Sequence, residues 1–129
     1  MTFSKKQRIE VHSKFNGKCA YCGVEIELKN MQIDHIIPQY NFTKHINNRF
    51  RIPKFLTHLT ESDLNHIDNL HPACRVCNKW KSDHDLELFR SELSEQVKRL
   101  NLYSSNYRIA KKYGQIQETI EPIIFFFEK

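Results

Sequence analysis

Apolar and charged residues alternate over residues 24–28, in the first third of the chain. A period of two predicts a strand with one buried face. Lys29-Asn30 reads as a turn, and the sequence MQIDHII over residues 31–37 predicts the partner strand of a hairpin. Pro38 limits the continuation of that second strand, because proline cannot donate to a strand ladder.

Other segments have the pattern of helices. Residues 4–7 read S-x-x-Q, a capping box that opens a short basic helix, which Gly17 can end. Residues 103–113 predict a late helix ended by Gly114, and residues 120–127 a closing strand. Before that late helix, apolar residues recur at steps of three and four and predict a helix with one apolar face: Leu86, Phe89, Leu93, Val97 and Leu100.

These elements predict an α+β protein in two parts. We expect residues 1–85 to form one module, and residues 86–129 a mainly helical C-terminal extension ending in a strand. The 129 residues suffice for one compact domain, or for a small core with an appendage. The apolar stripe of the extension is expected to pack on the first module. A homodimer through the same face is the alternative.

The composition is that of an ordinary globular protein, 40% hydrophobic and 27% charged. No apolar run approaches the length of a membrane span, and residues 1–15 lack the apolar core of a secretory signal. We therefore expect an intracellular protein with no membrane partner. The net charge of +5 weakly favours a polyanionic partner. Four zinc-bound thiolates would lower it to about +3, so charge alone identifies no partner.

Four cysteines form the clearest chemical pattern in the chain. A two-residue spacer lets both sulfurs of a pair bind one ion, and two such pairs complete a tetrahedral site that is typical of structural zinc. An intracellular chain disfavours disulfides, and two matched pairs disfavour a redox pair. An iron centre with the same ligands, in a redox protein, stays open. The cysteines are Cys19, Cys22, Cys74 and Cys77.

Polar residues near the two cysteine pairs predict a hydrolytic site. If one zinc ion binds both pairs, Asn78 is brought towards the hairpin that carries Asp34 and His35. A carboxylate and an amide can hold a hard divalent ion, and a neutral imidazole can deprotonate a water molecule.

At these residues the chain resembles the HNH nuclease family. The matching segments are CAYCG, IDHIIP and NLHPACRVCNKWK, which together cover roughly residues 19–83. The resemblance implies a ββα-metal fold, in which a hairpin and a helix clamp one catalytic ion over a DNA phosphate. It also implies that His35 is the general base, that Asp34 binds the ion, and that Asn69 orients the hairpin loop and helps to position His35. Asn78 stands where many members carry histidine, an H-N-N variant whose amide suits Mg²⁺ or Mn²⁺.

Basic residues are expected to contact the DNA backbone. The resemblance implies that Lys81 contacts a phosphate. From His35 through Thr60 the chain has no acidic residue, and its basic residues are interleaved with aromatic and apolar ones. This pattern favours contact with DNA, with a solvated loop as the alternative. The basic residues of this stretch are Lys44, Arg49, Arg51 and Lys54.

The sequence thus predicts a metal-dependent DNA endonuclease or nickase with structural Zn²⁺ and catalytic Mg²⁺ or Mn²⁺. Freestanding HNH proteins of this size resemble those of bacteria and phages, so the expected location is the cytoplasm of a bacterium or of a phage-infected host. The alternative is a zinc-stabilised nucleic-acid-binding module without catalysis. That module would be unaffected by the loss of His35.

Overall fold

The computed structural model describes residues 2–40 and 50–129. Its contacts divide the chain into two units, Met1–Leu86 with Ile124–Lys129, and Glu87–Ile123. In the described part of the chain, no helix is long and apolar enough to cross a membrane. Strands and helices are both present, so the predicted mixed α+β class is confirmed.

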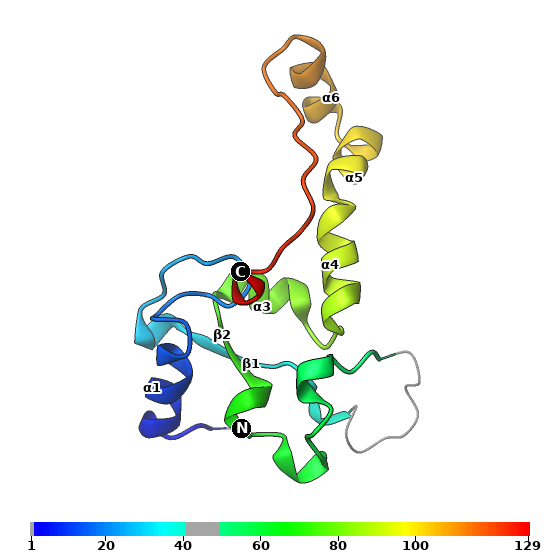
Figure 1. Cartoon of the computed structure of the whole chain (residues 1–129). Helices are drawn as coiled ribbons and strands as arrows, with labels where there is room; N and C mark the ends of the chain where they lie inside the picture. Colours follow the sequence, from blue (N-terminus) through cyan, green and yellow to red (C-terminus); the bar gives the residue numbers. More distant parts are fainter. Residues whose placement is uncertain (1, 41–49) are drawn as a thin grey trace. The chain divides into compact units, whose positions relative to one another are not determined.

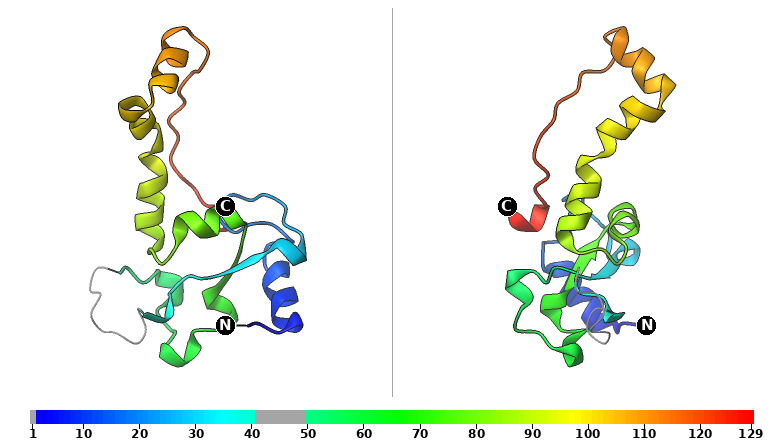
Figure 2. Two further views of the ribbon diagram at one scale, coloured as in Figure 1. Left: turned by 180° about the vertical axis from the view of Figure 1, so that it is seen from behind. Right: turned by 90° about the vertical axis from the view of Figure 1, so that its right-hand side faces the viewer.

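The centre of the first unit is a pair of antiparallel strands, β1 (Gln32–His35) and β2 (Leu70–Ala73). Asp34 lies opposite His71 in this pairing. Helix α3 (Arg75–Lys81) follows β2 directly and packs against β1. The three elements can be followed in Figures 1 and 2. Their chain order is strand, strand, helix.

The predicted hairpin is wrong, because β1 pairs with β2 and not with residues 24–28. That segment instead folds back on the residues before it, with a bridge between Glu25 and Lys18, and ends in a 3-10 helix, Leu28–Asn30. The Val24 carbonyl accepts a hydrogen bond from the Cys19 amide, so the backbone of this segment is bonded to the first cysteine pair. A period of two indicates a strand-like face, but the partner of β1 comes from much later in the chain.

The first helix, α1 (Lys5–Ser13), begins as predicted at a capping box. The Gln7 amide donates to Ser4 Oγ (3.1 Å), and the Ser4 amide donates to Gln7 Oε1 (2.8 Å). Gly17, with φ of +78°, follows the end of the helix. The Arg8 guanidinium donates to two backbone carbonyls just before β1 and so ties α1 to that strand.

Short 3-10 helices complete the first unit between the strands: Lys54–Leu56, Glu61–Asp63 and Ile67–Asn69. Its apolar interior draws on residues from all of its segments. Among the described residues of this unit, the buried hydrophobic side chains include Val11, Cys19, Ala20, Tyr21, Ile26, Met31, Ile36, Ile37, Leu56, Leu70, Ala73 and Phe125.

Helical segments make up most of the second unit. The single helix predicted over residues 86–100 is two helices, α4 (Leu86–Ser94) and α5 (Gln96–Tyr103), separated at Glu95. The predicted late helix is α6 (Ser105–Lys112). The side chains of Asn101, Tyr107 and Lys111 all bond to Glu118 Oε1, at 2.7, 3.0 and 3.0 Å respectively. Glu118 thereby ties the segment after α6 to α5 and α6.

The predicted closing strand at residues 120–127 is wrong. The chain is irregular up to Phe125 and ends in a 3-10 helix, Phe126–Glu128. The consecutive amides of Phe126 and Phe127 both donate to the first cysteine pair, to the Tyr21 and Ala20 carbonyls. Neighbouring amides of a strand point in opposite directions, so this arrangement is a turn.

Candidate metal centre and active site

The four cysteines come together as predicted. Their sulfur atoms all lie within 4.8 Å of one another, although the pairs are far apart in sequence. The Sγ atoms of Cys22 and Cys74 are 3.8 Å apart. In a tetrahedron with Zn–S bonds of about 2.3 Å, the sulfurs are about 3.8 Å apart. The cluster is therefore consistent with a structural zinc ion bound by Cys19, Cys22, Cys74 and Cys77.

The turn that carries the first cysteine pair depends on a glycine. The Gly23 amide donates to the Cys19 carbonyl (3.0 Å), and the Cys19 amide donates to the Val24 carbonyl (2.8 Å). Gly23 has a φ of +78°, and a Cβ there would lie 2.8 Å from Cδ1 of Phe126. Only glycine satisfies both the backbone conformation and this close approach.

The thiols of the cluster influence one another. A hydrogen bond from Cys77 lowers the pKa of Cys19 to about 4, while the same interaction raises the pKa of Cys77. A thiolate at Cys19 is thus favoured by the protein itself. Thiolates are the form in which cysteine binds zinc, so this hydrogen bond favours the zinc-binding form of Cys19 and disfavours that of Cys77.

Asp34, the predicted ion ligand, is buried near the end of β1. Burial raises the pKa of its carboxyl, although Lys81, Tyr21 and His35 oppose that shift. The ammonium of Lys81 lies 3.2 Å from Oδ1, and the Tyr21 hydroxyl donates to Oδ2. The carboxylate is therefore held on both oxygens.

Lys81, the predicted phosphate contact, has no exposed surface. Its ammonium lies against Asp34 and donates to the His35 carbonyl (3.3 Å). A solvated lysine would satisfy its charge in water, whereas a buried one needs such partners. A phosphate contact would require this ion pair to open.

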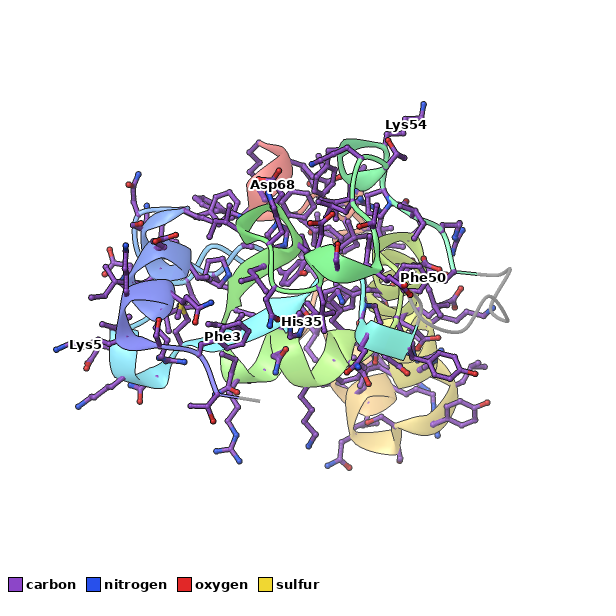
Figure 3. The ribbon with its side chains drawn as sticks, turned by 90° about the horizontal axis from the view of Figure 1, so that it is seen from below. Phe3, Lys5, His35, Phe50, Lys54 and Asp68 are labelled. Carbon is purple, nitrogen blue, oxygen red and sulfur yellow. The ribbon has the colours of Figure 1, made fainter. Side chains whose placement is uncertain are left out.

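His35, the predicted general base, is half-buried at the end of β1. Its Nε2 lies 2.8 Å from Asn65 Oδ1, and its ring centroid is 5.8 Å from that of Phe3. Figure 3 shows His35 on the β1 ribbon with Phe3 beside it. Because an amide oxygen only accepts hydrogen bonds, the Asn65 contact places the ring proton on Nε2 and leaves Nδ1 as an acceptor.

Asn69, predicted to orient the loop near His35, is fully buried. Its Oδ1 accepts from the Ile37 amide (2.8 Å), and its Nδ2 donates to the carbonyls of Ile37 (3.0 Å) and Leu64 (2.9 Å). Its own carbonyl accepts from the Ile36 amide (2.9 Å). Asn69 therefore clamps the backbone immediately after His35.

Asn78, the second predicted ion ligand, is half-buried on α3. It lies three residues before Lys81, so the two side chains share a face of the helix. Among the described contacts, none joins the Asn78 side chain to Asp34 or His35. The structure thus gathers Asp34, His35 and Lys81, while Asn78 lies one turn before Lys81 on α3.

The predicted DNA-binding stretch is only partly described. Lys44 and Arg49 lie outside the described residues. The Arg51 guanidinium forms an ion pair with Asp85 (3.1 Å) while most of its side chain stays exposed. Lys54 is exposed and projects outward, apart from His35 in Figure 3.

The residue pattern did not single out Tyr21, Asn65 or His71. Tyr21 lies between the cysteines of the first pair. The two-residue spacing identifies the cysteines but says nothing about the residues between them. His71 Nδ1 lies 3.1 Å from the Tyr21 hydroxyl. The strand register opposite Asp34 could have indicated His71, but that register was predicted with the wrong partner.

Comparison with known proteins gives a distant relative. No protein-family model matches the chain. The chain is 33% identical over 73 residues to the "SPbeta prophage-derived putative HNH endonuclease YoqL" of Bacillus subtilis (strain 168). The match covers 57% of this chain and only 26% of that relative.

A solved structure, the Type II-C Cas9 enzyme from Actinomyces naeslundii, matches with a TM-score of 0.47 and 20% identity. The match covers 87% of this chain and 12% of that one, and is too weak to establish a common fold. The resemblance to a known family therefore rests on the sequence relative and on the four-cysteine cluster. Together they confirm the resemblance of this chain to the HNH endonuclease family that its motifs indicated.

Proposed function

We propose that this chain is a metal-dependent endonuclease or nickase that hydrolyses DNA phosphodiester bonds. The observation that carries the proposal is the end of β1, where a buried carboxylate and a half-exposed imidazole follow one another. The B. subtilis relative is described as a putative HNH endonuclease, which agrees with this chemistry. The chain spans only 26% of that relative, so the activity is proposed from the local site.

Asp34 and Asn78 are the proposed holders of a divalent ion, Mg²⁺ or Mn²⁺. Each carboxylate oxygen can accept two hydrogen bonds or ligand contacts, and in Asp34 one partner engages each oxygen. The Lys81 ammonium already pairs with Oδ1, so a bound ion would use the remaining lone pairs of the carboxylate. A bound ion would neutralise charge that develops on the phosphate and on the leaving oxygen.

His35 is the proposed general base. Its Nε2 is engaged by Asn65, so Nδ1 is the atom that would take a proton from the attacking water. Asn69 holds the Ile37 backbone just after His35 through two side-chain hydrogen bonds and the Leu64 carbonyl through a third, and thereby fixes where the ring stands. The ring of Phe3 limits its freedom on one side.

The proposed substrate is DNA, and the proposed setting is a bacterial or phage-infected cell, as the prophage origin of the relative suggests. Lys54 and the exposed part of Arg51 are the described basic residues proposed to contact its backbone. These contacts would be electrostatic and independent of base sequence.

The test is cleavage of supercoiled plasmid by zinc-loaded protein with Mg²⁺, with Mn²⁺ or with EDTA. We expect nicked or linear product only with the divalent ion. His35→Ala should abolish the product, because it removes the base but leaves the zinc ligands in place. His58→Ala is the matched control, since His58 is an exposed histidine that pairs with Asp68 away from β1.

Equal cleavage by wild type and His35→Ala would contradict the proposed base. If neither protein cuts and both bind DNA with equal affinity, the chain is the non-catalytic binding module. Zinc content and circular dichroism of each variant show that a loss of cleavage does not reflect unfolding.

A further inference from the structure

Tyr21 connects the first cysteine pair to the proposed catalytic carboxylate. It lies between Cys19 and Cys22, and its hydroxyl donates to Asp34 Oδ2. Only 4% of Tyr21 is exposed, so this polar contact is formed away from water. A buried hydroxyl requires such a partner, and a buried carboxylate requires such a donor.

A second residue, His71, also forms a hydrogen bond with the Tyr21 hydroxyl. His71 Nδ1 lies 3.1 Å from Tyr21 Oη, and His71 stands opposite Asp34 in the strand register. Burial lowers the pKa of His71 well below its ordinary value, so the ring is neutral. Since the Tyr21 proton points to Asp34, His71 donates through Nδ1–H and the hydroxyl oxygen accepts. The chain of donors therefore runs from His71 through Tyr21 to Asp34.

Aromatic packing fixes the ring that carries this hydroxyl. The centroid of the Tyr21 ring is 5.3 Å from those of His71 and Phe125, and 6.1 Å from that of Phe127, all in edge-to-face geometry. The backbone of Tyr21 is fixed as well, because its carbonyl accepts from the Phe126 amide (3.0 Å). The hydroxyl therefore has little freedom to move away from Asp34.

We propose that Tyr21 is a positioning residue, which orients the Asp34 carboxylate for the divalent ion and links the geometry of the catalytic ion to the structural zinc site. The inference rests on the proposed function, since it concerns the same carboxylate. Lys81 holds Oδ1 from α3, which carries Cys77, and Tyr21 holds Oδ2 from the first cysteine pair. Each half of the zinc site thus supplies one partner to Asp34.

The experiment measures Mn²⁺ affinity of zinc-loaded protein by electron paramagnetic resonance. Tyr21→Phe removes only the hydroxyl and keeps the ring. Loss of a hydrogen bond that orients a metal ligand typically weakens metal affinity about 10- to 100-fold, and we expect a loss of that size. Tyr107→Phe is the matched control, because it also removes a hydroxyl that donates to a carboxylate, Glu118, outside the site. The control should bind Mn²⁺ as wild type does.

Asp34→Asn separates this inference from the proposed function. If wild type and Tyr21→Phe bind Mn²⁺ equally while Asp34→Asn binds weakly, the role of Tyr21 is wrong and the ion site stands. If wild type binds no better than Asp34→Asn, both are wrong. Zinc content and near-ultraviolet circular dichroism report whether the core around Tyr21 is intact.

Should Tyr21→Phe fail to fold, His71→Gln tests the same link. It leaves the Tyr21 hydroxyl in place but changes the group that holds it. We expect a measurable loss of Mn²⁺ affinity relative to wild type, with zinc retained. Mn²⁺ affinity identical to wild type in a folded His71→Gln would mean that the relay behind Tyr21 plays no part.

Discussion

The charge of Lys81 is fully buried and pairs with Asp34. Removing one partner of a buried ion pair leaves the other charge without compensation. We expect Lys81→Met to lower the free energy of unfolding by about 3 kcal/mol, within the range typical of such losses. Urea unfolding of zinc-saturated protein measures it.

Lys79→Met is the control, because Lys79 is an exposed lysine on the same helix, α3. An exposed substitution usually changes stability by less than about 0.5 kcal/mol. A Lys81→Met variant as stable as this control would contradict the buried pair. It would favour a Lys81 that is free to contact a phosphate.

His71 makes stability depend on pH. In the unfolded chain its pKa is near the ordinary value of about 6.5. In the folded protein the pKa is well below that value, chiefly because of burial, with Lys14 and Lys81 adding to the shift. The unfolded state therefore binds a proton that the folded state excludes. The stabilisation is complete above about pH 6.5 and is lost as pH falls, by up to about 1.4 kcal/mol per unit.

Urea unfolding of wild type and His71→Gln at several pH values from 7.5 to 5 tests this expectation. Zinc loss at low pH affects both proteins, so their difference isolates the histidine. The advantage of wild type should shrink as the pH falls below about 6.5. Parallel curves would mean that the pKa of His71 is the same in the folded and unfolded protein.

Tertiary context also determines the roles of single residues at the site. The spacing of the cysteines and the Asp-His pair could be recognised in the sequence, because ligand chemistry restricts both. The inward orientation of Tyr21 and the burial of Lys81 could not. Tyrosine and lysine occur at many solvated positions, and only packing determines which of them lose contact with water.

At the scale of elements, we expect α3 to depend on a zinc ion at the cysteine cluster. Its seven residues are too few for a helix that is stable by itself, and it begins between two cysteines of the cluster, Cys74 and Cys77. Structural zinc can contribute about 10 kcal/mol or more of folding free energy, comparable to the whole stability of a domain. Chelation should therefore unfold the first unit, with loss of helical circular dichroism.

The number of zinc ions per chain and the visible absorption of the protein are measured alongside the chelation test. We expect one zinc ion per chain, released on treatment with a thiol-modifying reagent, and no visible colour. A coloured protein that contains iron would contradict the zinc assignment. A Cys77→Ser variant that keeps one zinc ion and full stability would contradict the role of the cluster.

Local patterns predicted helices better than strands. The Ser4 capping box placed the start of α1 correctly, because its hydrogen bonds join residues that are three apart. The partner of β1 was predicted incorrectly, because β2 lies far along the chain and its pairing leaves no local signal. The segment 24–28 was expected to pair with β1, but its backbone is used in the turn of the first cysteine pair.

At the scale of the whole molecule, the chain divides into the unit that holds the candidate site and the helical unit Glu87–Ile123. Within the helical unit, Glu118 receives side chains from both α5 and α6. We expect Glu118→Ala to speed amide hydrogen exchange in residues 105–123, because it removes the acceptor that these side chains share. Hydrogen exchange read by mass spectrometry measures this change segment by segment.

Zinc content and plasmid cleavage of Glu118→Ala should match those of wild type, since Glu118 has no part in the proposed site. Faster exchange at β1 and β2 in this variant would show that the two units unfold together. Exchange unchanged throughout would mean that the Glu118 contacts do not stabilise the helical unit.

The sequence by itself determined the clustered cysteines, the Asp-His pair and most helix positions. These depend on residue chemistry and on contacts within a few positions along the chain. Tertiary structure alone decided the partner of β1, the ion pair between Lys81 and Asp34, and the hydroxyl that holds the other carboxylate oxygen. Each of these joins residues distant in sequence, and their energies come from burial and exclusion of water, which no local pattern records.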